Sequence, residues 1–106
     1  MTRYLFIESR DPFESRDTFI EDTATALKQR GHDVTVFLIQ NGVLAARKNA
    51  QRLGRLSQAG ITLLVDDFSL CERGIQPAEL TSGIQQATVD TLVEALVNEN
   101  TKAIWH

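Results

Sequence analysis

Cysteine, proline and long apolar runs are scarce in this sequence of 106 residues, which contains one cysteine, Cys71, and two prolines. A single cysteine excludes an intramolecular disulfide framework. No apolar run approaches the roughly 20 residues that a membrane-spanning helix needs, and the apolar stretch at residues 4–7 is too short for a signal peptide. We therefore expect a cytoplasmic protein with no membrane contact.

An excess of positive charge is also missing, because eleven basic and fourteen acidic residues give a formal net charge of −3. This balance argues against nucleic acid as a partner, since basic side chains that neutralise phosphates supply most of that affinity. One local basic stretch consists of Arg47, Lys48, Arg52 and Arg55. We interpret it as an exposed, solvated helix face, with docking of an anionic partner as the alternative.

Glycine is absent from the first loop, residues 8–17, and the sequence contains neither a phosphate-binding loop nor a G-x-G-x-x-G pattern. Nucleotide binding therefore has no support, and we expect no cofactor. The two histidines, His32 and His106, are far apart in the sequence. With one cysteine and no histidine pair at ligand spacing, we expect no metal site.

What the sequence does contain is an alternation of short apolar runs and helical patterns. Strands are predicted at residues 4–7, 34–39, 61–65, about 83–85, and 102–105. A first helix is predicted to start at Asp11-Pro12-Phe13-Glu14, which reads as a capping box, and to end at Gly31. A second follows Asn41-Gly42 and ends at Gly60, a short third ends at Arg73, and a fourth covers residues 89–97.

This order of elements predicts one α/β domain over residues 1–106. Right-handed crossovers would give a doubly wound, five-stranded, mainly parallel sheet with helices on both faces. We expect a flavodoxin-like arrangement that lacks the final helix, because the sequence stops at His106. The missing helix would leave apolar sheet exposed, which predicts a homo-oligomer that buries Trp105 or its neighbours between subunits.

In open parallel sheets, ligands bind beyond the carboxyl ends of the strands. The candidate binding residues at that rim are Ser9, Asp11, Asn41, Gly42, Asp66, Asp67, Ser69 and Arg73. Cys71, the candidate catalytic residue, is interpreted either as a nucleophile or sulfur carrier, or as a small buried hydrophobic residue.

The Asp66-Asp67 pair has two interpretations. It could form a metal or phosphoacceptor site of the kind found in receiver domains, with Glu8 and Asp11 supplying further oxygens. Receiver domains also need a lysine at the carboxyl end of the fifth strand, whereas Lys102 begins that strand. We therefore favour capping of the short third helix by one of the two aspartates.

A set of residues spread along the chain carries a family resemblance through its order and spacing. These residues are Phe19, Ala26-Leu27, Gly31-His32, Phe37, Gly42-Val43, Ala46 and Arg73-Gly74-Ile75. The chain resembles the DsrE/DsrF-like family of small sulfur-relay proteins, which includes the Tus-type subunits that pass persulfide sulfur toward tRNA thiolation. The resemblance implies a compact α/β domain, a trimer, a hexamer or a hetero-oligomer with related subunits, and a persulfide-carrying protein as donor.

Sulfur-carrying members of that family place a reactive cysteine near the end of the third strand, a fixed distance before the Arg-Gly pair. Counting back from Arg73, that position is Asp66, and the second cysteine of some members corresponds to Ser69. The resemblance thus implies an oligomeric sulfur-relay protein or a non-catalytic, relay-associated subunit, with Cys71 displaced from the family position. The alternative functions are a receiver-like signalling domain that uses Asp66 or Asp67, and a binding scaffold with no chemistry.

Overall fold

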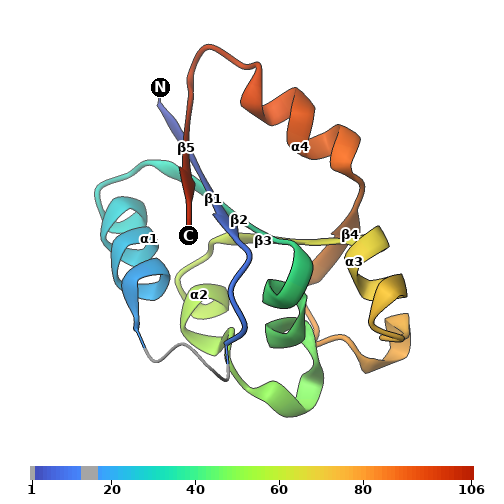
Figure 1. Ribbon diagram of the computed structural model, residues 1–106. Helices are drawn as coiled ribbons and strands as arrows, with labels where there is room; N and C mark the ends of the chain where they lie inside the picture. Colours follow the sequence, from blue (N-terminus) through green and yellow to red (C-terminus); the bar gives the residue numbers. More distant parts are fainter. Residues whose placement is uncertain (1, 13–16) are drawn as a thin grey trace.

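A computed structural model describes residues 2–12 and 17–106 of the chain. Within this part, five strands form one sheet in the order β4-β3-β2-β1-β5, and every neighbouring pair is parallel (Figure 1). The strands are β1 (Arg3–Glu8), β2 (Asp33–Leu38), β3 (Thr62–Asp66), β4 (Ile84–Ala87) and β5 (Thr101–Trp105). The predicted α/β class and parallel sheet are confirmed.

The strand order differs from the flavodoxin order that we expected, in which the first strand lies between the second and the third. Here β1, β2, β3 and β4 are added one beside the next, and the connection through α4 (Val89–Leu96) returns the chain to the free side of β1. Right-handed crossovers in opposite directions put their helices on opposite faces. Accordingly, α1 (Phe19–Gln29) and α2 (Gly54–Gln58) lie on one side of the sheet and α4 lies on the other (Figure 1).

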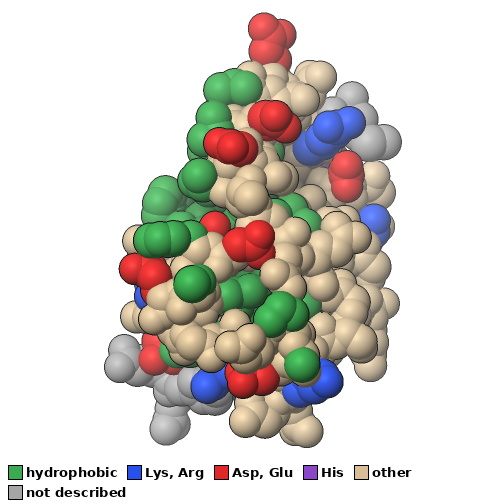
Figure 2. Space-filling view, turned by 90° about the vertical axis from the view of Figure 1, so that its right-hand side faces the viewer, with side chains coloured by type: hydrophobic (Ala, Val, Ile, Leu, Met, Phe, Trp, Pro, Cys, Tyr) green, Lys and Arg blue, Asp and Glu red, His purple; other side chains and the backbone are tan. Residues whose placement is uncertain are grey.

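The two faces of the sheet are buried to very different extents. The α1 and α2 side holds the larger core, which includes Phe6, Val36 and Leu63. Among the described residues, the core on the α4 side has four buried members, Leu5, Ile7, Phe37 and Leu92. Consequently the outer surface of α4 and the neighbouring elements keep large apolar side chains exposed, and hydrophobic and acidic side chains are interspersed on this side (Figure 2). The exposed ones are Phe68, Val89, Val93, Leu96, Val97 and Trp105.

The first helix begins later than the sequence predicted. Asp11 and Pro12 are not helical, and α1 starts at Phe19; Phe13 and Glu14 of the expected capping box lie outside the described residues. At this start the N-cap residue is Thr18, whose hydroxyl donates to the Asp22 carboxylate at 2.7 Å, and the Asp17 carboxylate accepts a hydrogen bond from the Phe19 amide at 3.2 Å. The end of the helix is as expected, with Gly31 in a left-handed conformation at φ +87°.

The second helix was expected to be continuous up to Gly60, and this prediction was wrong. The segment forms two 3₁₀ helices, η1 (Gln40–Ala46) and η2 (Lys48–Ala50), before the short α2. Arg47 is extended and bridges to Leu80, and Gln51 takes a left-handed conformation, so the helical hydrogen-bond ladder is interrupted twice. The apolar pattern was nevertheless meaningful, since Ala46, Leu53 and Leu56 are all buried.

The remaining elements follow the expected order. They are α3 (Asp67–Glu72), the 3₁₀ helix η3 (Pro77–Glu79), β4 within one or two residues of the predicted position, α4 and β5. No helix in the described ranges is long and apolar enough to cross a membrane.

Gly42 is required by a close approach between η1 and the end of β1. The Ile39 amide donates to the Glu8 carbonyl oxygen at 3.0 Å, which draws the start of η1 against that peptide group. A Cβ atom added to Gly42 would overlap the Glu8 carbonyl oxygen and lie 2.9 Å from its carbon. Both obstacles are backbone atoms, so neither can rotate away.

We expect Gly42→Ala to lower the free energy of unfolding by about 2–3 kcal/mol, because the new methyl group forces β1 and η1 apart. Gly54→Ala is the matched control, since nothing lies within 4 Å of a Cβ added there, and it should change stability by less than about 1 kcal/mol. Urea unfolding followed by circular dichroism measures both values. Equal effects of the two substitutions would contradict this account.

Candidate functional site

The carboxyl ends of β1, β2 and β3 meet at one rim of the sheet, as the parallel arrangement predicted. In the sheet register Glu8 pairs with Leu38, and Leu38 pairs with Val65, one residue before Asp66. The segments that follow the three strands therefore leave the sheet side by side. This rim contains most of the candidate residues.

Asp66 is the centre of a hydrogen-bonded cluster at the rim. Its Oδ2 atom accepts the Ser69 amide at 3.0 Å and the Ser69 hydroxyl at 2.7 Å. The Ser69 hydroxyl oxygen in turn accepts the Gln40 amide at 2.9 Å. Asp66 and Ser69 are 8% and 3% exposed. Asp66 is thus the N-cap of α3, which confirms the capping interpretation for Asp66 rather than Asp67.

Arg73 ties the same cluster to η1. Its Nε and Nη2 atoms donate to the Asn41 Oδ1 atom at 3.2 and 3.0 Å, and Nη1 donates to the Ser69 carbonyl oxygen at 3.1 Å. A planar guanidinium can make such a forked contact, which a lysine could not. The structure therefore brings together Asn41, Asp66, Ser69 and Arg73, with Gly42 next in the chain.

The other predicted rim residues lie apart from this cluster. The Ser9 hydroxyl accepts the Trp105 indole N–H at 3.1 Å, at the joined ends of β1 and β5. Asp11 lies in the segment after β1, and none of the hydrogen bonds of the cluster includes it. Asp67 and Cys71 line a separate hollow of about 260 Å³ near β4.

Cys71 is exposed, so the interpretation as a buried hydrophobic residue was wrong. Ser69 and Cys71 are two positions apart on α3, which turns them to nearly opposite sides of the helix. Accordingly Ser69 is buried in the rim cluster, whereas Cys71 opens toward the hollow beside Gln76 and Gln86. The thiol does not share a cavity with Asp66.

The receiver-like arrangement has no geometric support. Lys102 pairs with Tyr4 near the start of β1, whereas Asp66 pairs with Ala87 at the end of its strand. Lys102 therefore lies near the amino ends of the strands and Asp66 at their carboxyl ends. Among the described residues, no group of three histidine, cysteine or acidic side chains is placed to hold a metal ion.

The basic stretch is divided by the fold. Arg55 forms an ion pair with Asp22 at 2.7 Å, and hydrogen bonds from the Thr18 hydroxyl and from Arg55 hold the pKa of the Asp22 carboxyl below its usual value. Arg52 donates to the Pro12 carbonyl oxygen. Lys48, Arg52 and Arg55 are exposed, as interpreted, but the stretch does not lie on one helix.

A cavity that the sequence did not reveal opens directly onto the Asp66 cluster. This rim pocket has a volume of about 280 Å³ and lies between β2, α3, α4 and β5. Its aromatic walls are Phe37, Phe68 and Trp105. The other lining residues are Ile39, Gln40, Asp66, Ser69, Glu72, Val89 and Leu92. No local motif joins these residues, because they come from four separate segments of the chain.

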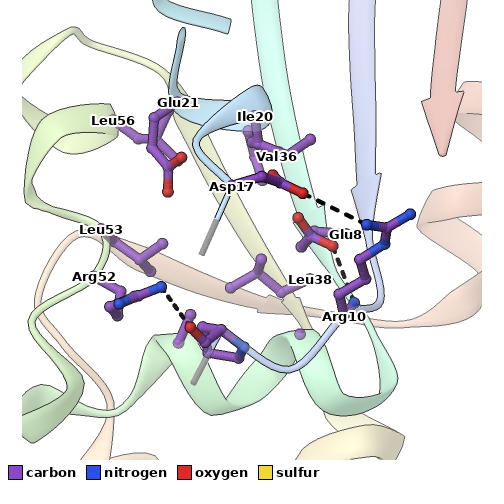
Figure 3. Close-up of a pocket in the computed structure, with 13 residues that line it drawn as sticks. Glu8, Arg10, Asp17, Ile20, Glu21, Val36, Leu38, Arg52, Leu53 and Leu56 are labelled. Carbon is purple, nitrogen blue, oxygen red and sulfur yellow. Dashed lines mark hydrogen bonds and ion pairs between the residues drawn. The ribbon is translucent and has the colours of Figure 1, made fainter. Parts of the chain in front are cut away.

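A second unexpected group surrounds His106, next to a narrow cavity between the sheet, α1 and α2. Its Nδ1 atom lies 2.8 Å from Glu8 Oε2 and its Nε2 atom 3.2 Å from Asp17 Oδ2, and the ring stacks on Phe19. Figure 3 shows Glu8, Arg10 and Asp17 together on one side of that cavity. These contacts fasten the end of β5 to β1 and to the start of α1.

We expect Asp66→Ala to destabilise the protein by about 1–2 kcal/mol, because the amide and hydroxyl of Ser69 lose their acceptor. Asp67→Ala removes the same charge from an exposed neighbour and should cost about 0.5 kcal/mol or less. Thermal unfolding of the two variants beside the parent protein provides the comparison. A larger loss from Asp67→Ala would show that the cap has been assigned to the wrong residue.

Comparison with known proteins identifies the family. A model of the DsrE/DsrF-like family matches residues 2–103. No curated protein matches the chain. The fold is similar to that of YchN from E. coli, with a TM-score of 0.82, 20% identity, and coverage of 98% of this chain and 100% of that one.

Two proteins of unknown function have similar structures. MTH1491 from Methanobacterium thermoautotrophicum has a TM-score of 0.84 and 20% identity, with both chains fully covered. BT1422 from Bacteroides thetaiotaomicron has a TM-score of 0.77 and 21% identity, covering 96% of this chain and 94% of that one. The match of the family model over nearly the whole sequence shows that this chain belongs to the DsrE/DsrF-like family.

Proposed function

We propose that this protein acts in intracellular sulfur transfer as a relay-associated subunit that carries no sulfur at the rim. The burial and hydrogen bonding of Asp66 support this proposal. The family resemblance assigns to Asp66 the position of the reactive cysteine in sulfur-carrying members. Its carboxylate is buried and accepts two hydrogen bonds from Ser69. It serves as a helix cap and not as a nucleophile.

Chemistry gives the second reason. Sulfur passes between proteins when a thiolate attacks a persulfide sulfur, so a carrier needs an accessible thiolate at the docking site. A carboxylate at Asp66 cannot form a persulfide. Cys71 is accessible, but it opens to a different hollow, in which Asp67 is the neighbouring charge.

Sulfur uptake from glutathione persulfide, followed by intact-protein mass, tests this proposal. We expect Cys71 to take up sulfur about as fast as free cysteine at the same thiol concentration, because the fold offers it no assistance. Cys71→Ser is the control and should take up none. Uptake about tenfold faster than free cysteine, and lost in Cys71→Ser, would contradict the proposal and make Cys71 a carrier.

We also propose that the protein works as an oligomer, either with itself or with related subunits. The apolar side chains exposed on α4 support this, since Val93 and Val97 are 51% and 75% exposed. Exposed apolar patches mark association sites. The smaller core on the α4 side of the sheet also supports association, because a second subunit would cover that side.

Light scattering at micromolar concentration should give a mass of several subunits for the parent protein. Val93→Asp should lower that mass, because a charge would be buried in the contact. Gln29→Asp adds the same charge at an exposed position on α1 and should leave the mass unchanged. A monomeric parent protein would refute self-association.

A further inference from the structure

The rim pocket combines aromatic walls with carboxylates. Phe68 and Trp105 stand at its mouth, 69% and 64% exposed, and Phe37 is buried in its floor. Asp66 and Glu72 are the charged residues among the described lining, which includes no lysine or arginine. Aromatic faces and carboxylates both attract cations, whereas neither attracts an anion.

Asp66 has the capacity to bind a ligand as well as to cap α3. Both of the hydrogen bonds that it accepts from Ser69 end on Oδ2. A carboxylate offers acceptor sites on each of its two oxygens. Because Asp66 lines the pocket and is nine-tenths buried, a donor that reached it there would meet a carboxylate largely removed from water. A hydrogen bond to such a group is stronger than one at the surface.

Glu72 supplies the second negative charge, at the other side of Ser69 on α3. Its carboxylate also lies 3.6 Å from the Arg73 guanidinium, which is held by Asn41 and does not line the pocket. The described lining of the pocket therefore carries two carboxylates, with Asp66 as the buried one and Glu72 as the exposed one. Gln40 completes the polar side, and its left-handed backbone is held in place by Ser69.

We propose that the rim pocket binds the guanidinium or ammonium group of a basic side chain presented by a polypeptide partner. The mouth of the pocket favours a polypeptide over a small free amine, because the apolar surface of Phe68, Trp105 and Val89 extends beyond a cavity of about 280 Å³. A chain that inserts one basic side chain can cover that surface with its neighbouring residues. This inference deepens the proposed function, since it makes the rim a docking point for a relay partner without a thiol.

Trp105 is the protein's one tryptophan, so its fluorescence reports directly on this pocket. The probes are the peptides acetyl-Gly-Arg-Gly-amide and acetyl-Gly-citrulline-Gly-amide, which differ in charge and hardly in shape. The arginine peptide should change the Trp105 emission saturably, with a millimolar dissociation constant, and the citrulline peptide should bind at least about fivefold more weakly. Equal binding of the two peptides, or no binding of either, would overturn the proposal.

Three variants of equal net charge locate the effect. Asp66→Asn keeps a capping oxygen but removes the buried charge, and should weaken binding of the arginine peptide by about fivefold or more. Asp67→Asn, in the separate hollow, should leave binding unchanged. Glu72→Gln should weaken binding about twofold, and it retains the test if Asp66→Asn fails to fold. Equal affinities for all folded variants would overturn the proposal.

The same fluorescence signal identifies a competing occupant. A second copy of the chain would show itself in two ways. Dilution of the protein without peptide would shift the Trp105 emission, and the arginine peptide would bind only to the dissociated form and no better than the citrulline peptide. Together these results would place the pocket in a contact between copies of the chain and overturn the proposal. Neither the peptide titration nor the dilution experiment depends on sulfur uptake by Cys71. The peptide experiment and the persulfide experiment can therefore fail separately.

Discussion

The acceptance of two hydrogen bonds by the Asp66 carboxylate is the interaction on which the rim depends. A buried carboxylate is stable only when it is hydrogen-bonded, and Ser69 supplies both donors. The first contact starts α3, and the second orients the Ser69 hydroxyl toward the Gln40 amide. Gln40 keeps a left-handed backbone that costs free energy, and this contact helps to hold it. The start of α3, the backbone at Gln40 and the wall of the rim pocket therefore all depend on the Asp66 carboxylate as hydrogen-bond acceptor.

The winding of the sheet explains why this rim is open. Because β2, β3 and β4 follow β1 in one direction, their connections crowd onto one face and bury it well. The return through α4 leaves a single helix to cover the opposite face. The apolar side chains beside α4 and the aromatic mouth of the rim pocket both follow from that imbalance. Exposure at the rim is a consequence of topology rather than of composition.

The sequence predicted what depends on neighbouring residues. Apolar runs located the strands, the glycine at position 31 marked a helix end, and Asp66 was recognised as a candidate cap. It did not predict the strand order, because the apolar runs are the same in either order. Nor did it predict the contact of His106 with Glu8, since these residues meet only through the pairing of β1 with β5. The prediction of a continuous second helix was wrong because the long-range bridge between Arg47 and Leu80 overrides the local helical pattern.

A carboxylate and a thiolate can occupy the same helix start because both are anions that backbone amides stabilise. If Asp66 takes the place of the family cysteine, as we propose, the exchange of one for the other preserves the fold of the rim while it changes the chemistry. The thiolate is a nucleophile toward sulfur, whereas the carboxylate is only an acceptor of hydrogen bonds and a partner for cations. Under this proposal the chain lacks the covalent step, and the rim keeps a charged, aromatic-lined surface. We infer that recognition, and not transfer, is the property that this rim retains.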